Sequence, residues 1–215
     1  HWATGGGDTA NQGPHQFDVA RWGLNKNEHP VEIYSMGGLY GIKPEECSQE
    51  TPNTQTSVFK YKDGKMLEFE TRGRYTNAEG SLNIQIGNIF YGTEGYVEID
   101  GGTWKAFRRR ERQPFAGSGV ASDRPADPTF MAPPGGGSHY ANFIDAIRSG
   151  KNEDLNCDIL DGYMSACLPA LANISYRVGR RLLFNGETEK FIKDKEADKL
   201  LTRVYRAPYV VPKVV

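Results

Sequence analysis

The residues best suited to chemistry lie near the start of the chain, in a glycine-rich segment that leads into a predicted helix. His15 and Asp18 are three residues apart, so a helix places them on one face. Asn11 comes just before this helix and can lie beside His15. A histidine in the first helical turn meets the positive end of the helix dipole, which favours the neutral imidazole that a general base needs. We therefore predict that His15 accepts a proton from a substrate hydroxyl and that Asp18 orients its ring.

The same pair also has a purely structural interpretation. A histidine and an aspartate in a first helical turn often act as local capping partners. No metal site is predicted, because the histidines and cysteines of the chain lack compact ligand spacing. Cys157 and Cys167 fall in an apolar helical stretch and are predicted to be buried thiols.

The helix that carries His15 is predicted to run from about Pro14 to Trp22, with Gly23 just beyond its last turn. From residue 31 to about residue 110 the pattern changes to short runs rich in β-branched and aromatic residues, which are typical of strands. Asp63-Gly64 is a strong hairpin signal. Because the connections between runs are short, the sheet is predicted to be mainly antiparallel.

Helices return in the second half of the chain. Residues 111–137 lack periodicity and are predicted to form a long surface loop. Ser138 is predicted to cap a helix over 139–148, and apolar residues at helical spacing predict a longer helix over 158–178 that packs on the sheet. A short helix is predicted near residues 196–201. Strands followed by helices predict an α+β fold, with a mainly antiparallel open-faced sheet and helices packed on one face.

The second face of this sheet carries apolar side chains that need an explanation. Ile89, Tyr91 and Trp104 are predicted to lie there, which makes this face a candidate for pairing subunits. The alternative is that these are scattered surface residues, which are common on soluble proteins.

Composition excludes several classes of partner. The 215 residues carry a formal net charge of −1, so we predict neither nucleic acid nor a membrane surface as a partner. No apolar stretch approaches the roughly 20 residues of a membrane helix. The chain begins at His1 without a methionine and is interpreted as an internal fragment, so its compartment, cytoplasmic or bacterial periplasmic, stays open.

Several segments together resemble one enzyme family. The segment GGGDTANQGPHQFDVARWGL resembles the opening of the second domain in the Gfo/Idh/MocA family, the glucose–fructose oxidoreductase and inositol dehydrogenase group. The family pattern of Gly-x-His-x-x-Asp falls on Gly13, His15 and Asp18, with Asn11 before it. The resemblance continues, in the expected order, through IFYGTEGYVEID, YANFIDAIRSGK, LANISYRVGR and LTRVYRAPYVVP.

The resemblance implies a two-domain enzyme. An N-terminal Rossmann domain with GxGxxG binds NAD or NADP, and a Glu-Lys-Pro segment supplies a lysine that works beside the histidine. Neither motif is present in residues 1–215. We therefore predict that residues 1–215 form a single substrate-binding and oligomerisation domain, the second domain of a dihydrodipicolinate-reductase-like oxidoreductase. Alone, it is expected to be inactive and to bind the dinucleotide poorly.

The resemblance also implies which residues form the site. His15, Asn11 and Asp18 correspond to the catalytic positions, and Gly7, Asn11, His15 and Tyr163 are predicted to bind a sugar, cyclitol or related polyol. The cofactor-binding residues are expected mostly in the missing domain. Many family members carry Asp where this chain has Asn11, and an amide holds a hydroxyl without taking its proton. The resemblance further implies a homo-oligomer, a dimer or tetramer, formed through the open sheet face.

Two other functions fit the same sequence. Relatives in this family use a transient oxidation to cleave glycosidic bonds, so the chain also fits half of an NAD-dependent glycosidase or lyase. A non-catalytic carbohydrate-binding or assembly module is the alternative from another class. A parent gene without an upstream GxGxxG would favour that module over both enzymes.

Overall fold

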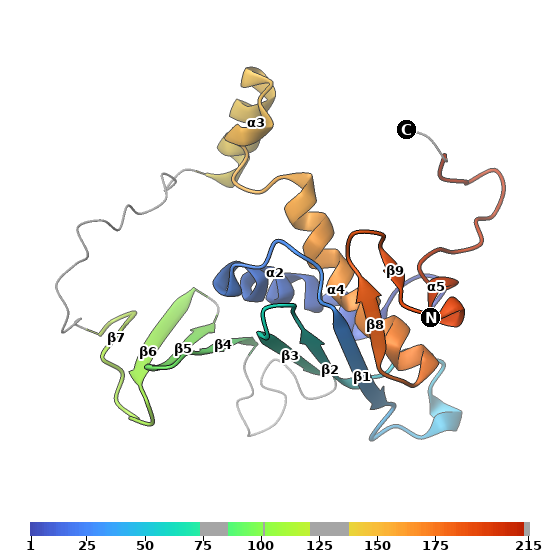
Figure 1. The fold of residues 1–215 in the computed structure, drawn as a ribbon, viewed down its shortest axis with the longest axis horizontal. Coiled ribbons are helices and arrows are strands. Elements are labelled where there is room, and N and C mark those ends of the chain that lie inside the picture. The colour runs from blue at the N-terminus through green and yellow to red at the C-terminus, as the bar shows by residue number, and fades with distance from the viewer. Residues whose placement is uncertain (74–85, 101, 121–137, 213–215) are drawn as a thin grey trace. The chain divides into compact units, whose positions relative to one another are not determined.

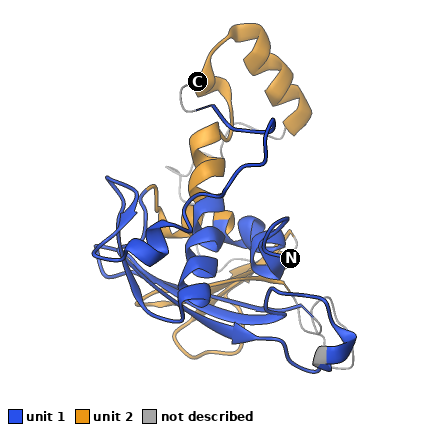
Figure 2. Ribbon diagram, turned by 90° about the vertical axis from the view of Figure 1, so that its right-hand side faces the viewer, with its two compact units in different colours: residues 1–17, 28–74, 166–215 blue, residues 18–27, 75–165 orange. Residues whose placement is uncertain are grey.

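The computed structural model describes residues 1–73, 86–100, 102–120 and 138–212 (Figure 1). They belong to two compact units, shown in different colours in Figure 2. Unit 1 comprises residues 1–17, 28–74 and 166–215, and unit 2 comprises residues 18–27 and 75–165. The boundary between the units falls inside two helices, α2 (Gly13–Leu24) and α4 (Ile159–Val178). The single-domain organisation therefore stays a prediction.

Unit 1 is built on a five-stranded sheet with the order β3-β2-β1-β8-β9. Every neighbouring pair in it is antiparallel, as predicted. Its strands are β1 (Glu32–Gly38), β2 (Thr54–Lys60), β3 (Met66–Arg72), β8 (Leu182–Asn185) and β9 (Lys190–Phe191).

The predicted hairpin joins β2 to β3. Lys60 pairs with Met66, and Gly64 adopts a φ of 89° that glycine accepts without strain. The turn is closed by the Tyr61 amide, which donates to the carbonyl of Lys65 at 2.9 Å. Alternate residues of both strands are buried, so only one face of this sheet builds the core.

The buried side chains in the core of unit 1 change from aromatic to polar along the strands. At one end, Phe17 of α2 is fully buried and lies 5.3 Å from the Phe59 ring and 4.4 Å from the Phe69 ring. At the other end, the buried positions of the same strands are polar, with Ser35 on β1 and Gln55 on β2. The C-terminal part of α4 covers this polar end, because its residues bond to both strands.

Unit 2 holds a separate antiparallel sheet with the order β4-β5-β6-β7. The sequence pattern predicts one sheet, whereas the described strands form two. β7 lies inside the segment predicted to be a long loop, and the predicted strand residues 82–85 fall outside the described residues. The strands are β4 (Gly87–Tyr91), β5 (Gly95–Asp100), β6 (Thr103–Arg108) and β7 (Ala116–Gly117).

The strand register corrects the predicted oligomer face. Ile89 pairs with Glu98, and Trp104 pairs with Ile99. Directly paired residues share a face, and neighbouring residues of one strand alternate. Ile89 and Tyr91 therefore lie on one face and Trp104 on the other. All three side chains are exposed, but they do not form one surface.

The end of α2 also differs from the prediction. The helix continues through Gly23 to Leu24 and ends at Asn25, which adopts a left-handed φ of 52°. Gly23 does not stop the helix. A Cβ there would lie 2.4 Å from the ring of Phe90, so glycine permits close packing on β4.

The remaining helices lie close to their predicted residue ranges, and the differences concern single residues. Ser138 precedes α3 (His139–Ser149), but its side chain makes no capping hydrogen bond. Leu160, one of the apolar residues of α4, lies in the first turn of the helix and is exposed. None of the described helices is long and apolar enough to span a membrane. The short elements are α5 (Lys195–Asp198), η1 (Pro44–Glu46) and η2 (Asn152–Asp154).

The aromatic end of the core gives a test of this packing. Replacement of Phe17 by Ala leaves a cavity between two rings and should lower the free energy of unfolding by about 3–5 kcal/mol. Trp22→Ala is the matched control, since Trp22 is 80% exposed and its truncation should change the free energy by no more than about 0.5 kcal/mol. Urea unfolding of the chain measures both. Equal losses for the two variants would contradict the packing described.

Candidate functional site

The glycine-rich segment predicted to be a loop contains a short helix, α1 (Gly7–Asn11). Two of its glycines, Gly6 and Gly7, are needed for close packing within unit 1. A Cβ at Gly6 would lie 2.7 Å from Nδ2 of Asn173, and one at Gly7 would lie 2.7 Å from Cβ of Thr51. Gly7 also has a positive φ of 68°, which other residues rarely adopt. The segment is therefore held tightly against its own unit.

Asn11 and His15 lie at the adjoining ends of α1 and α2, and both are exposed. Asn11 is the last residue of α1, and His15 lies in the first turn of α2. Within the described part of unit 1, no hydrogen bond or ion pair occupies either side chain. In this part of the unit, both can therefore meet a ligand without first breaking a hydrogen bond or an ion pair.

Asp8 is a titratable residue that the sequence analysis missed. It lies in the first turn of α1, half-buried against β3, where a Cβ on Gly73 would collide with its carboxylate. Burial raises the pKa of Asp8 above its usual value, because desolvation disfavours the charged form. An aspartate in a glycine-rich segment gives no sign of this, since the burial comes from a strand distant in sequence.

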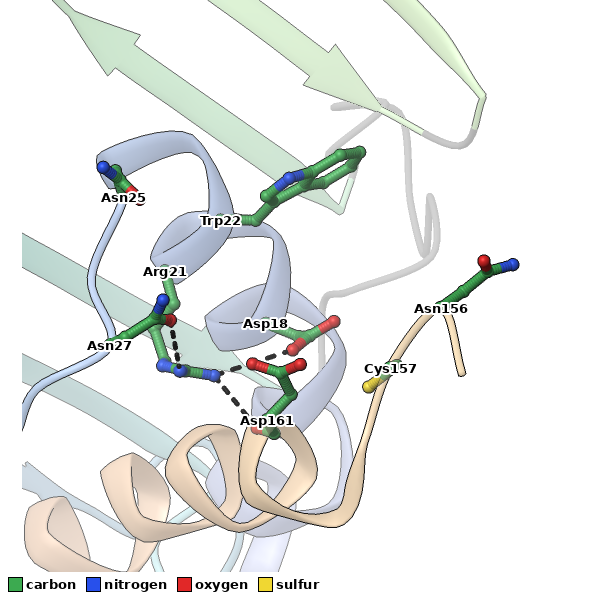
Figure 3. A pocket seen from close by; sticks show the side chains of 8 residues that line it. All are labelled: Asp18, Arg21, Trp22, Asn25, Asn27, Asn156, Cys157 and Asp161. Carbon is green, nitrogen blue, oxygen red and sulfur yellow. Dashed lines mark hydrogen bonds and ion pairs between the residues drawn. The ribbon is translucent and has the colours of Figure 1, made fainter. Parts of the chain in front are cut away.

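Asp18 takes part in a polar cluster within unit 2 (Figure 3). Ser165 of α4 donates to Oδ1 of Asp18 at 2.7 Å, and Nη1 of Arg21 donates to Ser165 at 2.6 Å. The guanidinium of Arg21 is buried and also donates to the backbone carbonyl of Asp161 at 3.0 Å. These hydrogen bonds give Asp18 a structural role within unit 2. The orientation of the His15 ring by Asp18 stays a prediction.

A cavity of about 370 Å³ lies beside this cluster. Cys157 reaches solvent at its edge and is not the buried thiol predicted, because α4 begins only at Ile159. Partial desolvation and then the nearby carboxylates, Asp161 first, raise the pKa of the Cys157 thiol. A thiol held in its protonated form is a poor nucleophile. The residues that line the cavity are Asp18, Arg21, Trp22, Asn25, Asn27, Asn156, Cys157 and Asp161.

The predicted site residues are distributed over both units. Gly7, Asn11 and His15 belong to unit 1, where they lie within one continuous segment. Tyr163 belongs to unit 2 and lies exposed on α4. Its predicted contact with substrate stays a prediction.

Gly6 and Gly7 of the glycine-rich segment do not form a cradle for the phosphates of a dinucleotide. A phosphate-binding glycine loop needs free backbone amides and open space beside its glycines. In this chain, the space beside Gly6 and Gly7 is filled by Asn173 and Thr51. No three His, Cys, Asp or Glu side chains of the described residues are grouped as metal ligands.

The buried position of Asp8 predicts a dependence of stability on pH. The folded pKa lies above the unfolded one, so the folded state holds the proton longer and loses stability as pH rises through this window. Asp8→Asn removes the ionisation and should raise the melting temperature at pH about 7.5, with the gain disappearing below pH about 4.

Thermal unfolding of the chain across this pH range measures the effect. Asp145→Asn is the control, because its side chain is 69% exposed on α3 and should show no such trend. A gain for Asp8→Asn that persists unchanged at acid pH would contradict the proposed cause.

Part of the chain matches the model of a known protein family. Residues 119–211 match the model described as the C-terminal alpha/beta domain of an oxidoreductase family, the Gfo/Idh/MocA family. No curated protein sequence matches the chain.

Three solved structures share the fold at low sequence identity. The aldose–aldose oxidoreductase of Caulobacter crescentus, complexed with glycerol, is 15% identical with a TM-score of 0.54. The WlbA dehydrogenase of Bordetella pertussis, in complex with NADH and UDP-GlcNAcA, is 15% identical with a TM-score of 0.51. An oxidoreductase of Agrobacterium radiobacter, in complex with NAD+, L-tartaric acid and magnesium, is 14% identical with a TM-score of 0.51.

These matches cover 80%, 81% and 80% of the chain, respectively. They cover only 46%, 44% and 47% of the matched proteins, so the chain spans less than half the length of each. Residues 119–211 thus resemble the C-terminal domain of the Gfo/Idh/MocA oxidoreductases, and the chain shares its fold with the three solved structures.

Proposed function

We propose that the chain is the substrate-binding half of an NAD(P)-dependent oxidoreductase that acts on a sugar, cyclitol or related polyol. The observation that carries this proposal is the pair Asn11 and His15, both exposed on a tightly packed segment of a family fold. Structural neighbours bound to NADH and UDP-GlcNAcA or to glycerol support the proposed classes of cofactor and substrate.

Oxidation of an alcohol removes one proton from oxygen and one hydride from carbon. The imidazole of His15 supplies a base for the proton. The amide of Asn11 holds a hydroxyl by accepting from it and donating to it, and takes no proton. The nicotinamide would accept the hydride, and we propose that a separate nucleotide-binding domain holds it. The greater length of the structural neighbours supports such a domain.

We further propose that the chain assembles as a homo-oligomer through the face of the second sheet that carries Ile89 and Tyr91. Tyr91 is 81% exposed and lies two residues from the exposed Ile89, so both project from one face. Adjacent exposed apolar side chains favour burial against another protein surface.

The role of His15 predicts a strong loss of turnover on substitution. In a protein that joins this chain to its nucleotide-binding domain, His15→Ala should lower kcat about 10²-fold or more. His139→Ala is the matched control, because His139 is exposed in unit 2, and should leave kcat within about twofold.

The assay follows reduction of NAD or NADP with a panel of sugars, cyclitols and polyols. Near-normal turnover of His15→Ala would remove this residue from the mechanism. Failure of the unmodified protein to oxidise any compound of the panel would contradict the proposed function itself.

If the chain assembles through this face, substitutions on the two faces of the second sheet should affect the oligomer differently. Tyr91→Lys should lower the average mass in sedimentation equilibrium, since it places a charge in the proposed interface. Trp104→Lys changes an exposed aromatic residue on the opposite face and should leave the mass unchanged. A chain that is monomeric without any substitution would refute the interface.

A further inference from the structure

A buried amide connects the site segment to the centre of unit 1. Gln55 of β2 is 1% exposed, and its Oε1 accepts a hydrogen bond from Oγ1 of Thr9 on α1 at 2.8 Å. Its Nε2 donates to Oγ of Ser35 at 2.9 Å and to Oδ1 of Asn173 at 3.3 Å. One side chain therefore links α1, the sheet and α4 within the same unit.

A second contact holds the start of the same segment. Nδ2 of Asn173 donates to the backbone carbonyl of Gly6 at 2.8 Å. Thr9 and Gly6 are thus held on either side of the first residues of α1. We call Gly6, Thr9, Gln55 and Asn173, with the hydrogen bonds among them, the positioning network.

The direction of every bond in the positioning network is fixed by one backbone group. The carbonyl of Gly6 only accepts, so the amide nitrogen of Asn173 must face it and the amide oxygen must face Gln55. That oxygen in turn requires the nitrogen of Gln55, which leaves the oxygen of Gln55 for Thr9. An inverted Gln55 would bring two oxygens together at Asn173, so only one arrangement satisfies all partners.

The site residues lie between the positioning network and a third anchor. Phe17 fixes α2 in the aromatic end of the core and is fully buried. Asn11 and His15 fall between Thr9 and Phe17, and both side chains remain exposed. Buried residues on both sides therefore hold this short segment. Within the described part of unit 1, the side chains of Asn11 and His15 make no hydrogen bond or ion pair.

We propose that Gln55 is a positioning residue that sets the placement of Asn11 and His15 by holding Thr9. This inference rests on the proposed function only for its effect on catalysis. A misplacement of about 1 Å in a reacting group can cost on the order of 10²-fold in rate, so loss of a buried anchor should be seen in turnover.

The test removes the Thr9 hydroxyl without changing the volume of the side chain. Thr9→Val leaves Oε1 of Gln55 buried without its donor. Thr9→Ser is the conservative variant, because it keeps the hydroxyl. Ser57→Ala is the matched control, since Ser57 is fully buried and bonded to Ser35 at 2.8 Å but lies outside the positioning network.

The first measurement is hydrogen exchange on the chain itself. In Thr9→Val, the amide of Gln12, which donates to the carbonyl of Asp8, should exchange at least about tenfold faster than in Ser57→Ala. Thr9→Ser should restore its protection. Equal exchange rates of the Gln12 amide in Thr9→Val and Ser57→Ala would overturn the proposal, because a general loss of stability raises the rate in both variants alike.

The second measurement is turnover in the joined protein. Thr9→Val should lower kcat about tenfold with little change in KM, whereas Ser57→Ala should leave kcat within about twofold. Normal kcat in Thr9→Val, in a protein that His15→Ala inactivates, would overturn the positioning role. Normal kcat in His15→Ala would instead remove His15 from the mechanism, and failure of the unmodified protein to oxidise any substrate would contradict the proposed function. In either case the exchange measurement would still decide whether Gln55 holds α1.

Discussion

The hydrogen bond between Thr9 and Gln55 joins the segment that carries the candidate site to the centre of the larger sheet. A buried amide must have all its partners, because an unsatisfied polar group in a core costs about 1–3 kcal/mol. Gln55 meets this requirement with three bonds to three different elements. An apolar side chain at this position would fill the space but would fix no orientation.

This constraint accounts for the division of the core into two ends. Aromatic packing around Phe17 and Phe59 supplies non-directional stability, since it depends on buried area and shape. The polar end around Gln55 and Ser35 supplies directional contacts, which admit one arrangement. Along the chain, Asn11 and His15 fall between Thr9, which bonds to the polar end, and Phe17, which packs in the aromatic end.

The sequence revealed the features that depend on nearby residues. The hairpin between β2 and β3 follows from Asp63-Gly64 and from alternation in the flanking strands, and α4 follows from its apolar periodicity. The start of α2 was within one residue of the prediction, but its end was wrong because Gly23 serves packing against Phe90. The resemblance to a family was visible because several short motifs occur in a fixed order, and residues 119–211 match that family's C-terminal model.

Features that depend on distant residues were missed. The helix α1 has only five residues and is stabilised by partners on β2 and α4, so no local pattern indicates it. Gln55 occupies a core position of β2, where a pattern of apolar and polar residues predicts an apolar side chain. Cys157 was assigned to an apolar helix that begins two residues later.

The glycine-rich segment shows why such a motif needs a structure for its interpretation. Glycines also line loops that bind phosphates, where the missing side chains admit a ligand. Here the missing side chains admit Asn173 and Thr51 of the chain itself. The close approach of Asn173 also brings its amide to the carbonyl of Gly6, which begins the ordered bonds that end at Thr9. The glycines therefore act on the site indirectly, by allowing the contacts that hold Asn11 and His15 in place.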